Sequence, residues 1–292
     1  MKYHFILNPA AGRGRVAGLR ETLVSETKKL FPEARFHVTG AAGDAQRTAA
    51  ALKKQADVVV AVGGDGTIHE IVNGLMGGRA ALGIVPVGSG NDFARMLGLN
   101  ADYRQALAVL LRDNRKFIDV GKANDEFFAN GVGIGFDAEV VVTSLKIKYL
   151  RGFLIYLSAV LQTLVKHENI DVSFAGSGQF QNKKIFMMTI GNGRSMGGGF
   201  YLTPEAIMDD GLFDVCVINS LTRREALIHL PKAVKGQHRE MPQVSFFRTP
   251  KICLESRDGF PAHADGEMLG TRIRRLDVKI IPGALQVIHN SD

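Results

Sequence analysis

Three loops of small residues interrupt the first hundred residues of the chain, and each follows an apolar run that predicts a β-strand. The loops are NPAAGRGRVAG (Asn8–Gly18), GGDGT (Gly63–Thr67) and PVGSGNDFAR (Pro86–Arg95). Strands that alternate with helical patterns in this way form βαβ units with a parallel sheet. Because the carboxyl ends of parallel strands lie at one edge of a sheet, we expect the three loops to converge there. The sequence therefore predicts an α/β domain with a ligand site at that edge.

The pattern changes near residue 122. From KFIDVGKANDEFFANGVGIGFD onward, short strand candidates follow one another directly and are separated by turn residues, and one long helix over about 143–167 interrupts them. We therefore predict two domains. An α/β nucleotide-binding domain covers residues 1–122, and a β-rich domain covers residues 123–292, with a C-terminal segment that can return to the first domain.

The charge balance narrows the choice of partners. The 36 Lys and Arg residues exceed the 29 Asp and Glu residues, which gives a formal charge of +7. That excess favours an anionic partner such as a nucleotide, a nucleic acid or an acidic membrane surface. The basic residues are scattered in small clusters, and no basic run is interleaved with aromatic residues, so we predict no nucleic-acid partner.

Three features predict a cytoplasmic protein that is at most peripheral at a membrane. The chain starts directly with a strand pattern rather than with a signal-peptide core. Its longest apolar stretch, Phe153–Val165, is shorter than the about 20 residues of a spanning helix. Cys216 and Cys253 stand in apolar, strand-like runs, so we expect buried thiols of a reducing compartment.

The loop GGDGT has the chemistry of a phosphate site that involves a metal ion. Gly64 and Gly66 allow the backbone to approach a phosphate closely, and Thr67 can cap the following helix. The loop lacks the lysine of a Walker A motif. Asp65 would repel phosphate oxygens unless a cation lies between them, so it predicts Mg²⁺ beside a nucleoside triphosphate. The alternative is a plain Asp-Gly turn without a ligand.

The first loop argues against a dinucleotide-binding oxidoreductase. Its glycines have the spacing Gly12-x-Gly14-x-x-x-Gly18, which is one residue longer than the Rossmann fingerprint. The second strand ends in VTG (Val38–Gly40), without the acidic residue that binds a ribose. Such a turn still offers backbone N–H groups to an anion. An oxidoreductase is therefore the weaker interpretation.

Two Asp-Gly pairs in the second half of the chain are strong signals for a hairpin turn. One lies in PEAIMDDGLFDV (Pro204–Val215) and the other in HADGEML (His263–Leu269). From the residues alone, the first is interpreted as a β-hairpin turn and the second as a surface turn. His263 is interpreted as a residue without a catalytic role, because the histidines show no metal-ligand spacing and no Ser-His-Asp signature is present.

NPAAG, GGDGT and PVGSGNDFAR, in this order and at this spacing, resemble the diacylglycerol kinase catalytic-domain family. The chain is similar to the soluble bacterial lipid kinases and to sphingosine kinases, with NAD kinases and phosphofructokinases as distant relatives. The resemblance covers nearly the whole chain, because the two later Asp-Gly motifs belong to it as well. It implies an NAD kinase/phosphofructokinase-like α/β domain with a parallel sheet, followed by a β-sandwich-like domain for the lipid substrate.

The resemblance also implies catalytic and ATP-binding residues. Asp265 matches the general base that accepts the proton of a lipid hydroxyl as this hydroxyl attacks the γ-phosphate. Glu267 would assist that base or bind Mg²⁺, and Asp65 would organise Mg²⁺ and phosphate. The implied ATP contacts are Asn8, Pro9, Ala10, Ala11, Gly12, Thr39, Gly64, Asp65, Gly66, Thr67, Ile68, His69, Glu70, Ser89, Asn91 and Asp92.

A structural Mg²⁺ is implied as well. Its ligands would be the carboxylate of Asp210 and the main-chain carbonyls of Ile207 and Leu212. A hard cation bound by carboxylate, carbonyl and water oxygens is chemically sound. The two carbonyls follow from the resemblance alone.

The predicted helix over about 143–167 is the candidate for membrane contact. Its basic start contains Lys146, Lys148 and Arg151. Each basic residue near an anionic bilayer contributes about 1 kcal/mol, so three of them give a reversible contact. The alternative is that the leucines of this helix pack in the core and its basic end is solvated.

Together these features predict an ATP- and Mg²⁺-dependent lipid kinase at the inner face of the membrane. Diacylglycerol is the expected acceptor, and phosphatidic acid is the expected product. A sphingoid base, another glycerolipid or NAD are alternative acceptors, and the second-domain motifs disfavour NAD. A nucleotide-binding regulatory protein without catalysis is the alternative from another class. A homodimer remains an open alternative to a monomer.

Overall fold

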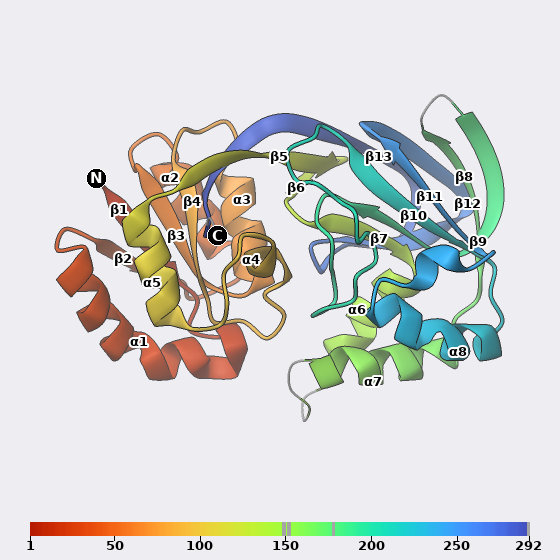
Figure 1. Ribbon diagram of the computed structural model, residues 1–292, viewed down its shortest axis with the longest axis horizontal. Helices are drawn as coiled ribbons and strands as arrows, with labels where there is room; N and C mark the ends of the chain where they lie inside the picture. Colours follow the sequence, from red (N-terminus) through yellow and green to blue (C-terminus); the bar gives the residue numbers. More distant parts are fainter. Residues whose placement is uncertain (148–149, 151–152, 177–178, 291–292) are drawn as a thin grey trace. The chain divides into compact units, whose positions relative to one another are not determined.

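The computed structural model describes the chain except residues 148–149, 151–152, 177–178 and 291–292. It divides into two compact units (Figure 1). Unit 1 comprises Met1–Ile118 together with Gly283–Asp292, and unit 2 comprises Asp119–Pro282. The last segment of the chain thus belongs to the unit that contains its start.

Unit 1 is built on a parallel sheet with the strand order β2-β1-β3-β4, to which the end of β13 adds next to β4. Its elements in chain order are β1 (Tyr3–Leu7), α1 (Ala11–Leu30), β2 (Arg35–Val38), α2 (Asp44–Leu52), β3 (Val58–Gly63), α3 (Asp65–Leu75), β4 (Ala81–Pro86), α4 (Asp92–Met96) and α5 (Tyr103–Arg112). Every residue of β1, β3 and β4 is buried. This is the pattern of strands covered on both faces, and it confirms the predicted α/β fold with a parallel sheet.

The register of the sheet places the three glycine-rich loops at one edge. Leu7 at the end of β1 lies opposite Val62 of β3, and Gly63 at the end of β3 lies opposite Pro86 of β4. The three strands are parallel, so they end side by side. The loops that follow them therefore start at neighbouring positions.

A stacked pair of histidines joins β1 to the edge strand β2. Nδ1 of His4 lies 3.0 Å from Nε2 of His37, and the ring centroids are 5.3 Å apart. Burial is the main cause that lowers the pKa of both imidazoles below the ordinary value of 6.5. The folded state therefore binds fewer protons than the unfolded state. The stability contributed by the neutral pair is present above pH 6.5 and is lost as the pH falls through the lowered values.

We expect the free energy of unfolding to decrease between about pH 7 and about pH 5. The decrease should be less steep in His37→Gln, because glutamine keeps a hydrogen-bonding group beside His4 and does not titrate. Urea unfolding at a series of pH values measures both slopes. Identical slopes for the variant and the wild type would contradict a role of this pair.

In the part of it that the structure describes, unit 2 is a mainly antiparallel β domain with three α-helices. Its strand order is β11-β10-β9-β7-β12-β13, while β8 pairs with β9 and β12, and β5 pairs with β6 and β13. The elements that lie wholly or mostly in this unit are β5 (Arg115–Ala123), β6 (Glu126–Phe128), β7 (Gly131–Gly135), α6 (Phe136–Ser144), α7 (Phe153–Leu164), β8 (Ile170–Gly176), β9 (Gln179–Gly191), β10 (Phe213–Asn219), α8 (Arg223–Val234), the 3₁₀ helix η1 (His238–Glu240), β11 (Val244–Thr249), β12 (Lys251–Ala264) and β13 (Glu267–Ile288). This architecture confirms the predicted β-rich second domain.

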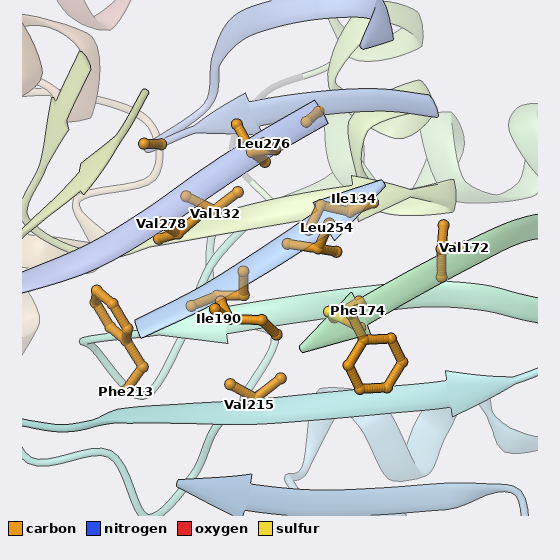
Figure 2. Packing of buried hydrophobic residues seen from close by; sticks show 14 of the residues in the cluster. Val132, Ile134, Val172, Phe174, Ile190, Phe213, Val215, Leu254, Leu276 and Val278 are labelled. Carbon is orange, nitrogen blue, oxygen red and sulfur yellow. The ribbon is translucent and has the colours of Figure 1, made fainter. Parts of the chain in front are cut away.

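One hydrophobic core fills the space among the strands of unit 2. Phe128, Phe213 and Phe260 are completely buried, and the rings of Phe128 and Phe213 stack with centroids 5.6 Å apart. Figure 2 shows side chains from six strands that point into the same space: Val132, Ile134, Val172, Phe174, Ile190, Phe213, Val215, Leu254, Leu276 and Val278. The core therefore joins strands that are far apart in the sequence.

Helices α6, α7 and α8 gather on one side of the strands of unit 2 (Figure 1). They form a second hydrophobic cluster with β9 and β10, in which Ala159 and Val160 of α7 and Cys216 of β10 are buried. Burial raises the pKa of the Cys216 thiol to about 12. This thiol is therefore protonated and packs as an apolar group.

The prediction of one helix over about 143–167 is wrong. α6 ends at Ser144, α7 begins at Phe153, and the described residues between them, 145–147 and 150, are not helical. The end of α6 is VVVTS, and β-branched and hydroxyl residues are poor helix formers. Thr163 Oγ1 donates to Thr143 Oγ1 at 2.8 Å. This bond holds α7 against the side of α6, so the two are separate helices that pack together.

α7 keeps an apolar outer face. The side chains of Leu154 and Leu161 in α7, and of Val165 next to it, are 56%, 44% and 63% exposed. Two basic residues of the predicted membrane contact, Lys148 and Arg151, lie outside the described residues. Within the described part of the chain, no helix combines the length and the apolar character that crossing a bilayer requires.

Candidate active-site residues

The three glycine-rich loops of unit 1 pack directly against one another. A Cβ atom added to Gly12 would lie 2.2 Å from the carbonyl oxygen of Val87. One added to Gly88 would lie 2.3 Å from Cα of Gly64. Contacts this close leave no room for a side chain, so glycine is required where these loops meet. The first, second and third loops are thereby brought together at the strand ends.

Gly88→Ala should weaken nucleotide binding, because the added Cβ pushes the third loop away from the second. Overpacking of this kind costs about 1–3 kcal/mol, which corresponds to a rise in the Kd for ATP of about 5-fold to about 150-fold. Calorimetric titration with MgATP measures the change. Gly18→Ala in α1 is the control, because a Cβ at Gly18 meets nothing within 4 Å. An unchanged Kd in Gly88→Ala would contradict a nucleotide site at these loops.

Asn8 ties the first loop to the second. Its Nδ2 donates to Thr67 Oγ1 at 3.0 Å, and its Oδ1 accepts a hydrogen bond from the Ala10 N–H at 3.1 Å. Thr67 does not cap the following helix as predicted, because α3 begins two residues earlier at Asp65 and its N-cap is Gly64. The hydroxyl of Thr67 instead connects the two loops.

Asp65 is the first residue of α3 and lies between the second and third loops. Its Oδ1 accepts a hydrogen bond from the Phe93 N–H at 3.4 Å, and a Cβ added to Gly90 would lie 2.6 Å from its Oδ2. The N–H groups in the first turn of a helix lack intrahelical partners and favour a phosphate. A carboxylate at the same helix start suits a cation beside that phosphate.

The third loop presents Ser89 and is held by the two residues after Gly90. Ser89 is exposed. Asn91 has a left-handed φ of 54°, and its Nδ2 donates to the Gly88 carbonyl at 3.2 Å. Asp92 is 5% exposed and forms an ion pair with Arg95. Asn91 and Asp92 therefore fix the loop, while Ser89 is presented to solvent.

Glu70 holds the loop between β2 and α2. Its carboxylate accepts hydrogen bonds from the N–H groups of Gly43 at 2.9 Å and Ala45 at 3.0 Å, which lie at the start of α2. Thr39 at the beginning of this loop donates through Oγ1 to the Leu7 carbonyl at 3.3 Å. Glu70 therefore connects α3 to the loop that carries Thr39.

The remaining residues of the implied ATP set divide by exposure. Ile68 and His69 are 2% and 4% exposed, so their side chains belong to the interior of unit 1. Residues 9–12 are partly or fully exposed around the start of α1, where residues 12–14 have left-handed backbone angles. The first loop therefore offers backbone groups at the surface.

Asp265 and Gly266 form the two-residue turn between β12 and β13. Their φ angles are 51° and 90°, as in the type I′ hairpin turn that Asp-Gly favours. The carboxylate of Asp265 accepts hydrogen bonds from three consecutive N–H groups, of Ala129 at 2.8 Å, Asn130 at 2.9 Å and Gly131 at 2.9 Å. These donors fix the carboxylate in one orientation at the tip of the hairpin.

The sequence did not predict this group of three N–H donors. The apolar segment FFANGVGIG divides into β6 and β7. The segment between them bonds to Asp265 and to Asn192, whose buried Nδ2 donates to the Ala129 carbonyl at 2.8 Å. The Asn-Gly pair at Asn130 was the available signal, since this dipeptide marks a turn.

Glu267 is exposed at the first position of β13, opposite Ala264 of β12. It thus follows the turn that carries Asp265. A role for its carboxylate beside Asp265 stays a prediction.

Asp210 lies in the turn before β10. Its Oδ1 accepts a hydrogen bond from the Leu212 N–H at 3.0 Å, and its Oδ2 lies 3.6 Å from Nη1 of Arg248. The interpretation of this motif as a β-hairpin is wrong, because residues 201–212 contain no strand. The segment is held by β5 instead, since the Asp119 N–H donates to the Met208 carbonyl at 2.7 Å.

Three carboxylates, those of Asp119, Asp210 and Asp214, belong to this turn or to the strands beside it. Asp119 Oδ2 accepts a hydrogen bond from the Gly211 N–H at 2.7 Å. Burial is the main cause that raises the pKa of Asp214, and its buried Oδ2 has no hydrogen-bond partner among the described residues. Within those residues no cluster of three or more metal-binding side chains is found. A cation here would therefore rely on main-chain carbonyls and water beside Asp210, as Mg²⁺ does.

The chain thus combines an α/β unit that has glycine-rich loops with a mainly antiparallel β unit. Both units match models of known protein families. The Diacylglycerol kinase catalytic domain matches residues 2–123, and the YegS C-terminal NAD kinase beta sandwich-like domain matches residues 130–289. The chain belongs to the diacylglycerol kinase catalytic-domain family. This confirms the family that the loop motifs indicated.

Individual relatives extend over most of the chain. A protein of Staphylococcus carnosus named "Diacylglycerol kinase" is 30% identical over 91% of this chain and 88% of its own length. A Pseudomonas putida protein named "Probable lipid kinase YegS-like" is 34% identical over 86% of this chain and 83% of its own. A solved structure from Bacillus anthracis str. Sterne, assigned to the diacylglycerol kinases, aligns with a TM-score of 0.83 at 26% identity. That alignment covers 99% of this chain and 97% of the other.

Proposed function

We propose that the protein is an ATP-dependent lipid kinase that transfers the γ-phosphate of ATP to the hydroxyl of a membrane lipid, with diacylglycerol as the preferred acceptor. The observation that carries the proposal is the packing of three glycine-rich loops around the start of α3, where Asp65 is the first residue. Helix starts of this kind bind phosphate groups. The relatives named as diacylglycerol and lipid kinases support it.

Each unit has a separate task in this proposal. In unit 1, the loops and the N–H groups at the start of α3 bind the phosphates, and Asp65 orients the cation that accompanies them. In unit 2, Asp265 orients the lipid hydroxyl and accepts its proton late in the transfer. The three N–H donors serve this role because they keep the carboxylate in one direction while the hydroxyl approaches.

Two Mg²⁺ sites belong to the proposal. One accompanies ATP at Asp65, where a bound cation would neutralise charge on the phosphates during transfer. The other is structural and uses Asp210 with the carbonyls of Ile207 and Leu212. The Asp210 carboxylate already orders its own turn through the Leu212 N–H. A cation at this place would hold the segment between β9 and β10.

Peripheral contact with an anionic membrane completes the proposal and places the enzyme in the cytoplasm at the inner face of the bilayer. The exposed side chains of Leu154, Leu161 and Val165 support it, because they form an apolar surface beside a basic segment of the sequence. A lipid dissolved in a bilayer reaches a kinase only at such a contact. Association into a homodimer stays a prediction.

A kinase for another lipid alcohol is the second candidate. The Pseudomonas putida relative, at 34% identity, carries the broader name of a lipid kinase rather than of a diacylglycerol kinase. Sphingoid bases and other glycerolipids therefore remain acceptors to test. A regulatory protein without catalysis is disfavoured, because both Asp65 and Asp265 are present.

An acceptor panel tests the substrate. The wild-type protein is supplied with labelled ATP, Mg²⁺ and anionic mixed micelles that contain diacylglycerol, a sphingoid base or a monoacylglycerol, and NAD is supplied in solution. We expect the highest kcat/KM with diacylglycerol. Faster transfer to a sphingoid base or a monoacylglycerol would contradict diacylglycerol as the preferred acceptor but would still support a lipid kinase. Transfer to NAD alone would contradict a lipid kinase.

A further inference from the structure

A buried histidine and aspartate stand directly behind the turn that carries Asp265. His263, the residue before the last in β12, is 2% exposed. Its Nδ1 accepts a hydrogen bond from the Gly266 N–H at 3.1 Å. On the other side of the ring, Nε2 lies 3.3 Å from Oδ2 of Asp137, in the first turn of α6. The imidazole thus connects α6 to the hairpin turn.

The contact with Gly266 determines which ring nitrogen carries the proton. A backbone N–H is always a donor, so Nδ1 must be the unprotonated nitrogen and the neutral ring carries its proton on Nε2. Nε2 is the ring nitrogen on the side of Asp137, with Oδ2 at 3.3 Å. Neither Nε2 nor Oδ2 forms a hydrogen bond among the described residues, so the contact between them is electrostatic. The carboxylate is therefore the group that favours this tautomer.

Gly133 keeps the space for this pair. It lies opposite His263 in the pairing of β7 with β12. A Cβ atom added to Gly133 would lie 2.2 Å from Asp137 Oδ2 and 2.3 Å from His263 Nε2. No other residue could stand here without separating the histidine from the aspartate. The pair therefore depends on three elements, β7, α6 and β12.

We propose that His263, oriented by Asp137, is a positioning residue for Asp265. The inference rests on the proposed function, in which Asp265 accepts the hydroxyl proton. Three N–H donors hold the carboxylate of Asp265, and the bond from Gly266 to His263 fixes the backbone on the other side of the same residue. These bonds hold, from both sides, the left-handed φ that the Asp-Gly turn adopts at Asp265. His263 is too buried to touch a substrate.

Two amide variants separate the two ring nitrogens. In His263→Asn the amide oxygen can replace Nδ1 as the acceptor for Gly266, whereas the longer side chain of His263→Gln reaches towards Asp137 in place of Nε2. We expect kcat to stay within about threefold of wild type in His263→Asn, and to fall about 10-fold to 100-fold in His263→Gln and His263→Leu, because a slightly misplaced catalytic group costs that much. The KM for ATP should stay unchanged in all three, since unit 1 binds the nucleotide.

Equal losses of kcat in His263→Asn and His263→Gln, or full kcat in His263→Leu, would overturn the inference. Asp265→Asn is measured beside them. If Asp265→Asn has the kcat of the wild type, the proposed role of Asp265 is wrong, and the positioning role of His263 is wrong as well. If it is inactive while His263→Leu is fully active, only the inference about His263 fails. Nitrogen NMR of the wild-type imidazole is independent of the variants: a proton on Nε2 supports the inference, and a proton on Nδ1 overturns it.

Discussion

Asp265→Asn should lose most phosphoryl transfer while it still binds ATP. The amide cannot accept the proton of the lipid hydroxyl, and loss of a general base lowers kcat about 100-fold to 10,000-fold. The change should appear in kcat rather than in the KM for ATP, because Asp265 belongs to unit 2 and the loops proposed to bind ATP belong to unit 1. Transfer of labelled γ-phosphate to diacylglycerol in anionic mixed micelles measures both constants.

A structural cost of this substitution has to be separated from the catalytic one. Asparagine offers one oxygen where Asp265 accepts three N–H groups, so its amide NH₂ would face the donor of Ala129 or those of Asn130 and Gly131. An unpaired buried donor costs about 1–3 kcal/mol, which is below the total stability of about 5–15 kcal/mol of a folded protein. Thermal unfolding and ATP affinity are therefore the controls. A folded variant with nearly wild-type kcat would refute the assigned base.

Asp65→Asn should lower kcat about 100-fold to 1,000-fold, as the removal of one preorganised electrostatic group does. Asparagine keeps an acceptor for the Phe93 N–H, so the start of α3 should persist. It loses the negative charge that is proposed to hold a cation beside the phosphates, so the Mg²⁺ concentration for half-maximal rate should rise. Titration of the rate with Mg²⁺ at saturating ATP gives both quantities.

Asp102→Asn is the matched control for Asp65→Asn. Asp102 also stands at a helix start, where its side chain accepts a hydrogen bond from the Arg104 N–H at 2.9 Å as the N-cap of α5. Asparagine is an equally good N-cap, and Asp102 lies outside the three glycine-rich loops. We expect wild-type kcat and Mg²⁺ dependence in this variant. The same behaviour in Asp65→Asn would contradict a metal role for Asp65.

The parallel sheet of unit 1 could be predicted because its strands are uniform and its loops are marked by glycine. VVVAV contains no polar residue and is followed directly by Gly63. This uniform pattern is typical of a strand that is buried on both faces. The packing distances at Gly12 and Gly88 could not be predicted, since they depend on how close neighbouring loops approach in space. The turn at Asp265 could also be predicted, because the Asp-Gly dipeptide is a local signal for a hairpin turn.

Contacts between distant segments were hidden from the sequence. The N–H donors of Asp265 come from a segment about 135 residues earlier, and a pattern of single residues carries no signal for such a bond. His263 was interpreted as a residue without a catalytic role, since its contact with Asp137 depends on the folded arrangement of β7, α6 and β12 and leaves no signal in the sequence. The break between α6 and α7 was missed because regular leucine spacing outweighed the weak helix formers at the end of α6.

The most direct test of the central claim is transfer of labelled γ-phosphate from ATP into membrane lipid by the wild-type protein. Mixed micelles that contain an anionic lipid and diacylglycerol are incubated with the enzyme in the presence and absence of Mg²⁺, and the organic phase is counted after extraction. We predict Mg²⁺-dependent label in phosphatidic acid. ATP binding without label in any extracted lipid, whatever acceptor is supplied, would contradict a lipid kinase and favour a regulatory nucleotide-binding protein.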